Sequence, residues 1–317
     1  MEQHTADLAG ALAERGHSVH VLGHKTYRDK FPAGVRFHPC PMSLGRKNLW
    51  LRWKIQRTLL RIRPDVVHAH GNKAANLAAK TKQAHWQAVG TIHGTKSSTR
   101  IFEDLDKVIA VSQAIYDQTH NPNKHLIFNG VSRQQSSSAA FPFKGDIKVV
   151  AAGRLEAVKG FDKLLQAWQR VRKTVPQAHL TVFGEGSLKS RLVAMTSSKG
   201  LTNSVTFAGF HENIGDILQH ADLLVISSER EGFPYVLAEA LVAGCPVLST
   251  PVSGCQELLP ATALTRDFSA EAIADRLVSA LKDLHRFKES QKGLFEYANN
   301  HLTVDAMTDA IVAVYQA

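Results

Sequence analysis

The sequence predicts an α/β protein with two doubly wound domains that face a cleft. Short apolar runs alternate with helical patterns along all 317 residues, and this alternation is typical of parallel sheets with right-handed crossovers. A polar stretch without periodicity, residues 133–145, divides the chain near its middle and leaves two halves of ordinary domain length. We therefore expect one domain at residues 1–140 and another at 141–300.

The expected strands are short apolar runs bounded by polar or turn residues. In the first half they are residues 18–22, 35–38, 65–70, 88–92, 107–111 and 125–128. In the second half they are residues 147–152, 179–183, 205–208, 222–227, 246–250 and 262–265. Helices are expected between them, and one at each end of the chain, over residues 3–15 and 304–316.

The first helix has no strand before it. A doubly wound domain normally opens with a strand and a glycine-rich turn, and in the strand order 3-2-1-4-5-6 that first strand is central. Its absence leaves two flanking strands without ladder partners. We expect either that Met1 is an internal methionine of a longer natural chain or that the sheet edge is rearranged there.

The net charge of +10 is concentrated in the first half. Residues 1–144 hold 21 Lys and Arg against 9 Asp and Glu, whereas residues 145–317 hold 17 against 19. A basic domain indicates an anionic partner, which leaves nucleic acid, an anionic lipid surface and an anionic soluble substrate open, beside a merely solvated basic face. A nucleic-acid partner fits least, because the chain has no recognition motif for one.

Cysteine usage and hydropathy predict a cytoplasmic protein. The three cysteines have unrelated spacings, which form neither a disulfide framework nor a metal knuckle and suit a reducing compartment. We find no apolar run of about 18 residues and no signal peptide at the start. The sequence thus predicts a globular chain that neither spans a membrane nor is secreted.

Residues 227–250 carry the strongest functional signal. They are predicted to form a strand, a turn with Gly232 and Pro234, a helix and a second strand, with Glu231 and Glu239 at one end. Two carboxylates placed in this way can accept bonds from hydroxyl groups. A proline is tolerated in a first helical turn, so the amides around it can point at an anion. This pattern predicts a phosphorylated sugar as ligand.

Three other loops at strand ends add polar groups and close backbone approach. Arg154 and Lys159 follow the strand at 147–152 and could neutralise a diphosphate, one by a forked contact and one as a point charge; the alternative is two solvated bases. Gly184 begins a Gly-x-Gly turn, a weak signal on its own. The loop with Phe210 could present a backbone edge to a nucleobase.

In the first half, histidines follow two predicted strands. His70 and His93 each precede a glycine, so a ligand can come close to the backbone while the imidazole donates to a hydroxyl or phosphate. The pair His68-x-His70 resembles a metal chelate, but no Cys or clustered carboxylate completes it. We therefore expect no metal site and a structural role for His68.

Residues 46–63 hold seven Lys or Arg among tryptophans and leucines. A helix with a cationic flank and an aromatic flank can lie on an anionic membrane. The alternative is a crossover helix that packs its Trp and Leu side chains on the sheet and points its arginines outward.

Taken together, these residues resemble glycosyltransferase family 4, retaining enzymes of the two-domain GT-B fold, over almost the whole chain. The most specific parts are the Glu231–Glu239 element with E-G-F-P, the G-R-L loop with Lys159-Gly160, and I-F-N-G-V at 127–131. V-V-H-A-H-G and T-I-H-G match more weakly. The resemblance implies an acceptor-binding first domain, a nucleotide-sugar-binding second domain, and a final segment, 301–317, that returns to the first.

The resemblance also implies roles for single residues. Arg154 and Lys159 would bind the donor diphosphate, and Glu239 would hold the nucleotide ribose. Glu231, with the backbone of Gly232 and Phe233, would hold hydroxyls of the transferred sugar. His93 would lie near the reacting centre. Gly184 and Phe210 complete the expected donor contacts.

The expected activity is metal-independent, retaining sugar transfer to a glycan or glycolipid acceptor, in bacterial cell-envelope polysaccharide or lipopolysaccharide synthesis. No cofactor is expected; the donor is a substrate, a UDP-sugar before others, although spacing alone does not distinguish UDP, GDP and ADP. The expected partners are donor and acceptor, with peripheral contact to the anionic inner membrane surface and no nucleic acid. Alternatives are a catalytically impaired nucleotide-sugar-binding protein and a GT-B epimerase or phosphorylase.

Overall fold

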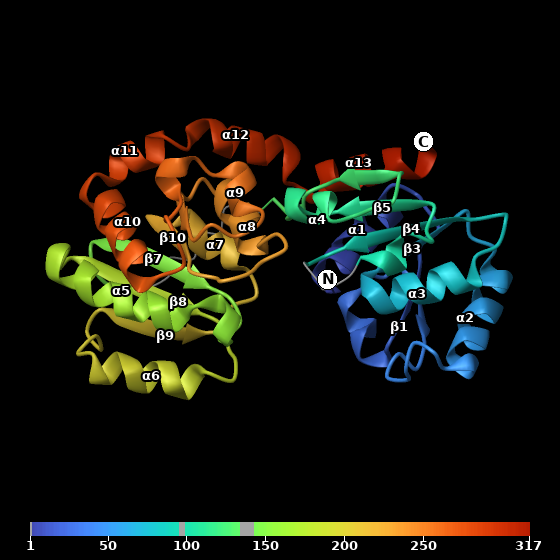
Figure 1. The fold of residues 1–317 in the computed structure, drawn as a ribbon, viewed down its shortest axis with the longest axis horizontal. Helices are drawn as coiled ribbons and strands as arrows, with labels where there is room; N and C mark the ends of the chain where they lie inside the picture. The colour runs from blue at the N-terminus through green and yellow to red at the C-terminus, as the bar shows by residue number, and fades with distance from the viewer. Residues whose placement is uncertain (1, 95–98, 134–142) are drawn as a thin grey trace. The chain divides into compact units, whose positions relative to one another are not determined.

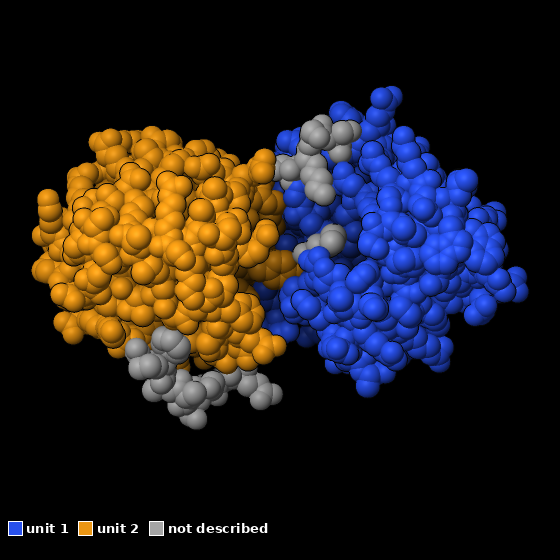
Figure 2. Space-filling view, turned by 90° about the horizontal axis from the view of Figure 1, so that it is seen from below, with its two compact units in different colours: residues 1–132, 303–317 blue, residues 133–302 orange. Residues whose placement is uncertain are grey.

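The computed structural model describes residues 2–94, 99–133 and 143–317. The chain divides into two compact units, Met1–Ser132 with Thr303–Ala317, and Arg133–Leu302 (Figures 1 and 2). The expected linker at 133–145 falls largely outside the described residues, as does Met1. Among the residues described, no helix combines the length and apolar character needed to cross a membrane.

The first unit holds two separate parallel sheets with helices around them. Its strands are β1 (His20–Gly23), β2 (Arg36–Pro39), β3 (Val66–His70), β4 (Gln87–Ile92), β5 (Lys107–Ala110) and β6 (Lys124–Leu126). Its α-helices are α1 (Glu2–Glu14), α2 (Leu49–Ile62), α3 (Gly71–Thr81), α4 (Gln113–Asp117) and α13 (Val304–Gln316).

The second unit holds one parallel five-stranded sheet in the order β11-β10-β7-β8-β9. Its strands are β7 (Ile147–Ala152), β8 (Ala178–Phe183), β9 (Val205–Gly209), β10 (Leu223–Ile226) and β11 (Val247–Ser249). Its α-helices are α5 (Phe161–Thr174), α6 (Lys189–Ser198), α7 (Ile214–Gln219), α8 (Tyr235–Val242), α9 (Cys255–Leu258), α10 (Ala270–Lys282), α11 (Leu284–Glu289) and α12 (Lys292–His301).

One predicted strand is wrong. Residues 262–265 do not form a strand, because the chain turns there into a 3₁₀ helix, η4 (Ala261–Ala263), behind Pro260. A single bridge, Ser249 to Leu264, is the pairing described for this segment. Alanine and proline are both disfavoured in strands, so the apolar pattern of this run does not indicate a strand. The other predicted runs are strands with ends shifted by a residue or two.

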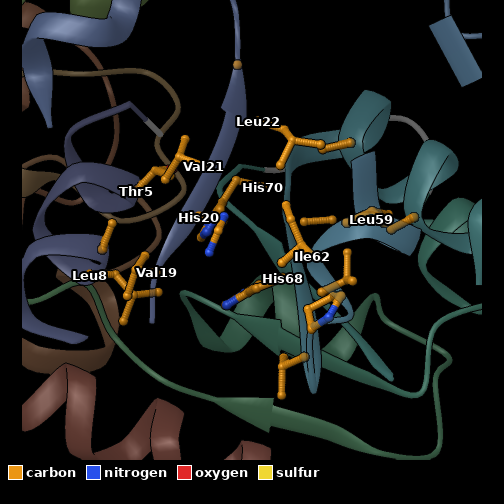
Figure 3. A pocket seen from close by; sticks show the side chains of 18 of the residues that line it. Thr5, Leu8, Val19, His20, Val21, Leu22, Leu59, Ile62, His68 and His70 are labelled. Atoms are coloured by element: carbon orange, nitrogen blue, oxygen red, sulfur yellow. The ribbon is translucent and has the colours of Figure 1, made fainter. Parts of the chain in front are cut away.

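The sheet of the first unit is interrupted where the sequence predicts a missing central strand. One sheet contains β1 and β2, the other has the order β3-β4-β5-β6, and in the described chain neither β1 nor β3 has a second neighbour. A cavity of about 870 Å³ lies at this place, lined by residues such as Val19, Val21, Leu22 and His68 (Figure 3). Two strand edges therefore border an open, mainly apolar space.

Helix α13, although last in the chain, belongs to the core of the first unit. Met307, Ile311 and Val314 pack in one cluster with Leu8 of α1 and Ile109 of β5. The entry into this helix is a close backbone contact, because a Cβ at Gly130 would lie 2.2 Å from the carbonyl oxygen of Thr303. Glycine is therefore required in the N-G-V run for α13 to lie here.

Candidate functional site

The sheet of the second unit has a topological switch point between β7 and β10. These two strands pair in parallel, yet the chain runs outward from β7 on one side and from β10 on the other. Doubly wound sheets bind ligands beyond the carboxyl ends of the strands at such a point. The loops that follow β7 and β10 therefore define the candidate site, and they carry Arg154, Lys159 and Glu231.

Lys159 and Glu231 meet across this switch point. The Lys159 ammonium donates to Glu231 Oε1 at 2.6 Å, and their side chains are only 20% and 14% exposed. Ser228 Oγ donates to the same carboxylate oxygen at 2.7 Å. The sequence predicts that these charges share a site, but not that they pair with each other or that Ser228 joins them.

The two loops are fixed to each other through their backbones. Ser227 Oγ donates to the carbonyl of Lys159 at 2.9 Å, and the Glu229 amide donates to the carbonyl of Val158 at 2.8 Å. Gly160 has a φ of +63°, and a Cβ there would lie 2.1 Å from the Ser227 carbonyl oxygen. The Lys-Gly sequence is thus needed for this close approach, which holds Lys159 in place.

Gly184 joins a second close contact at the same edge of the sheet. A Cβ at Gly184 would lie 1.9 Å from the Gly153 carbonyl oxygen, and the Gly184 amide donates to the carbonyl of Gly209 at 2.7 Å. The loops after β7, β8 and β9 are therefore packed backbone to backbone. Glycine is therefore needed at position 184 for this close packing of the loops, and not only for a tight turn.

The remaining predicted donor residues lie on these same loops or on the helix that follows them. Arg154 is exposed, next to Gly153, over which the aliphatic chain of Lys159 packs. Phe210 is 75% exposed directly after β9. Gly232 is partly exposed, Phe233 is buried, and Glu239 lies partly buried in the second turn of α8.

The start of α8 differs by one residue from the prediction. Pro234 is the N-cap, with φ −67° and ψ 122°, and the first helical turn begins at Tyr235. No acidic residue stands in this first turn, so the positive end of the helix dipole keeps its attraction for an anion. The helix begins directly after the loop that carries Glu231.

Four histidines of the first unit, His4, His68, His70 and His93, lie together near the carboxyl ends of β3 and β4. His70 Nδ1 and His93 Nε2 are 3.1 Å apart, and the ring of His4 lies 4.7 Å from that of His93. His68 is held by the Tyr315 hydroxyl at 2.6 Å and by Thr91 Oγ1 at 2.7 Å, as its predicted structural role requires. His4, on α1, was not among the predicted site residues.

Burial keeps His4, His68 and His70 uncharged near neutral pH. It lowers the pKa of His4 to about 4 and that of His68 to about 3, and it holds the pKa of His70 well below 6.5. Transfer of an imidazolium from water into a poorly solvated site disfavours the charged form. These three side chains are therefore neutral donors and acceptors.

Helix α2 does not pack its tryptophans on the sheet, as one of the two alternatives for this segment requires. Leu51, Ile55 and Leu59 are buried, whereas Trp50 and Trp53 are 54% and 53% exposed. Leu49 and Leu60 are also exposed, and basic side chains stand over both tryptophan rings, Lys54 over Trp50 and Arg57 over Trp53. The outer face of α2 is therefore apolar and basic together.

Comparison with known proteins identifies the family of the chain. Residues 132–301 match the family "Glycosyl transferases group 1", and residues 1–135 match "Glycosyltransferase Family 4". The chain is 24% identical to N-acetyl-alpha-D-glucosaminyl L-malate synthase of Bacillus anthracis, over 98% of this chain and 91% of that protein. It is 25% identical to the lipopolysaccharide core biosynthesis glycosyltransferase LpsE of Rhizobium meliloti, over 80% and 76%.

The fold also matches solved structures. Anabaena Alr3699/HepE in complex with UDP superposes with a TM-score of 0.82 at 21% identity, covering 99% of this chain and 95% of that one. This likeness shows the GT-B fold, and the family match covers more than half of the chain. The chain belongs to the glycosyl transferases group 1 family and is a glycosyltransferase of the GT-B fold.

Proposed function

We propose that this glycosyltransferase moves a sugar, with retention of anomeric configuration, from a UDP-sugar to a glycan or glycolipid acceptor in cell-envelope polysaccharide or lipopolysaccharide synthesis. The observation that carries the proposal is the contact of Lys159 with Glu231 at the switch point of the second unit. A cation for phosphate and an acceptor for hydroxyls stand side by side there, as a sugar diphosphate requires.

The site acts mainly by electrostatic stabilisation. As the bond between sugar and phosphate breaks, negative charge grows on the diphosphate and positive charge on the sugar ring. Arg154, Lys159 and the first amides of α8 stabilise the negative charge, and single donors of this kind contribute about 3 kcal/mol. These groups supply positive charge at the diphosphate without a metal ion.

Glu231 serves as a hydroxyl acceptor in this scheme. Lys159 and Ser228 both donate to its Oε1 atom, which orients the carboxylate. With the backbone of Gly232 and Phe233 it binds the transferred sugar, while Glu239 binds the ribose and Gly184 and Phe210 border the nucleotide. His93 of the first unit assists at the reacting centre. A covalent glycosyl intermediate on Glu231 is not part of the proposal.

The donor and the acceptor are supported by separate observations. HepE, which shares the fold, is solved with UDP and with UDP-glucose, and this supports a UDP-sugar. The basic first half and the outer face of α2 suit a glycan on an anionic lipid. We place the enzyme at the cytoplasmic face of the membrane, bound peripherally through α2.

Mutation of the two cations tests the proposal. In a UDP-release assay with a panel of UDP-sugars and lipid-linked saccharides, Lys159→Ala and Arg154→Ala should each lower kcat about a hundredfold or more. Glu239→Ala should mainly weaken donor binding, and Lys173→Ala, an exposed lysine on α5, should keep normal turnover. Normal rates in the Lys159 and Arg154 variants would refute the assignment.

A further inference from the structure

Three histidines of the first unit form a group that the transfer scheme uses only in part. His4 comes from the first turns of α1, His70 ends β3 and His93 follows β4. One ring nitrogen from each lies within 4.8 Å of the others. Three nitrogens bound to one zinc ion at 2.0–2.1 Å lie about 3.4 Å apart, so small side-chain movements bring these three to a common ion.

His4 presents a ligand atom that protein groups leave unused. Its Nδ1 lies 3.1 Å from Asn129 Oδ1, and because an amide oxygen only accepts, Nδ1 carries the proton and Nε2 keeps its lone pair. That Nε2 atom is buried and has no hydrogen-bond partner among the described residues. A buried acceptor without a partner is costly, and a metal ion satisfies it.

Asn129 is placed like the hydrogen-bond acceptors that orient ligating histidines in metal sites. A ligating histidine usually donates its other N–H to a carbonyl or carboxylate, which fixes the tautomer and the orientation of the ring. The contact from His4 to Asn129 has this form before any ion binds. Asn129 itself lies next to Gly130, whose close contact with Thr303 fixes the backbone there.

The other two ligands face each other. His70 Nδ1 and His93 Nε2 are 3.1 Å apart and share one proton. A bound ion takes the place of that proton, which moves to the second nitrogen of its own ring, so both imidazoles stay neutral. The His70 ring stacks on His68 at 4.4 Å between centroids, and His68 is held by Tyr315 and Thr91.

We propose that His4, His70 and His93 form a binding site for an exchangeable divalent transition-metal ion of the zinc class. Three imidazoles without thiolate or carboxylate suit Zn²⁺, Co²⁺, Ni²⁺ and Cu²⁺ and leave the hard cations Mg²⁺ and Ca²⁺ unfavoured. The fourth coordination position is open. The ion links α1 to the sheet, and it occupies His93, so it inhibits sugar transfer. Binding of the ion itself does not depend on the proposed transfer reaction.

Cobalt titration of the full chain tests the site directly. Co²⁺ added to the metal-stripped protein at neutral pH should produce the intense visible bands of tetrahedral cobalt, saturating at one ion per chain and lost on addition of one equivalent of Zn²⁺. His4→Gln and His70→Gln should weaken Zn²⁺ binding more than about a hundredfold, and Asn129→Ala about ten- to a hundredfold.

The control is His120→Gln, an exposed histidine of the same unit, which should bind both ions as the wild type does. A wild-type spectrum of octahedral, aquated Co²⁺ overturns the proposal even if the ligand variants fail to fold. Equal Zn²⁺ affinity in the wild type, His4→Gln and His70→Gln overturns it as well. Addition of Zn²⁺ should also raise the Tm of the wild type and of His120→Gln, but not of the two ligand variants.

Discussion

At the scale of single residues, Lys159 shows how the site is prepared before a donor binds. Its ammonium is paired with Glu231, and the backbone of its own loop is fixed to the loop after β10. Because the two charges are paired, neither is left uncompensated in a partly buried position, which would be costly. A sugar diphosphate must then replace both partners at once, with phosphate at Lys159 and hydroxyls at Glu231, which favours a ligand that carries both groups.

His68 makes the stability of the first unit depend on pH. Its folded pKa is about 3, against 6.5 in an unfolded chain, so below pH 6.5 the unfolded state takes up a proton that the folded state refuses. Stability is therefore complete above pH 6.5 and declines as the pH falls. Between pH 6.5 and 5 this residue accounts for a loss of about 2 kcal/mol.

Urea denaturation of wild type and His68→Gln at pH 7 and pH 5 measures this effect. Glutamine can still bond to Thr91 and Tyr315, so the variant should lose about 2 kcal/mol less than the wild type over this range. His120→Gln serves as the exposed control. The comparison with wild type also cancels the contribution of Asp7 to the pH dependence. Burial raises the pKa of Asp7 to about 6, so its contribution to stability changes with pH in the opposite direction. An identical pH dependence in wild type and His68→Gln would contradict the assignment.

At the scale of elements, the sequence predicted most of the strands but less of the site. Apolar runs of four to six residues identify buried parallel strands such as β7 and β10 well, because both faces are covered. The run at 262–265 has a similar apolar pattern but is not a strand, because Pro260 begins a 3₁₀ turn there. Arg154, Lys159 and Glu231 were predicted at one sheet edge by topology alone.

What the sequence could not supply is contact between distant residues. Ser228 lies inside the predicted segment, yet only the fold shows its bond to Glu231. His4 belongs to an amphipathic helical pattern, and nothing in that local pattern indicates that the helix begins beside His70 and His93. The sequence pattern also did not predict which side chains of α2 point inward, because both the inward and the outward face of this helix contain leucines.

The outer face of α2 should bind anionic membranes. Replacing both exposed tryptophans by alanine removes the apolar contact, and Lys54, Arg57 and Arg61 supply the charge. Arg52 is not a suitable target for mutation, because its guanidinium donates to the Lys80 carbonyl at 2.8 Å. In co-sedimentation with anionic vesicles, we expect the double tryptophan variant to bind at least tenfold more weakly than the wild type. The remaining charge does not replace the lost apolar contact, since each basic residue contributes only about 1 kcal/mol.

Two results separate this prediction from a general charge effect. Binding by the wild type should fall with added salt and be lost on vesicles of neutral lipid. Lys173→Ala, which removes a positive charge from the second unit, should bind as the wild type does. Undiminished sedimentation of the double tryptophan variant would show that α2 is not the contact.

The gap between β1 and β3 should accept an additional strand. Helix α1 begins at the carboxyl end of β3, since His4 contacts His70, so a strand leading into α1 would run parallel to β3 through the cavity. An N-terminal extension of about six β-branched residues and two glycines should add several kcal/mol to the free energy of unfolding, by pairing two open edges and filling apolar space.

Urea denaturation and amide exchange of β1 and β3 measure this effect. A matched extension with proline at every second position cannot form the ladder and should leave both quantities as in the unextended chain. Equal stability of the two extended proteins would mean that the cavity does not accept a strand.

At the scale of the whole molecule, the two units carry different features. Positive charge and the apolar face of α2 belong to the first unit, and the loops with Arg154, Lys159 and Glu231 belong to the second. The first unit has two parallel sheets and the second has one, and each unit has its own buried core. Ligand binding to one unit should therefore stabilise that unit first.

UDP should stabilise the second unit selectively. At about a hundred times its dissociation constant, a ligand that binds only the folded state adds about 2.7 kcal/mol to the free energy of unfolding. Amide exchange should slow at residues 153–160 and 227–237 and across β7 and β10, while amides in β3 to β6 change little. Arg154→Ala should weaken UDP and reduce this protection at equal ligand concentration, whereas Lys173→Ala should leave it intact. Protection centred on the first unit instead would place the nucleotide away from the switch point. That result would contradict the proposed role of the Lys159–Glu231 pair in binding the donor.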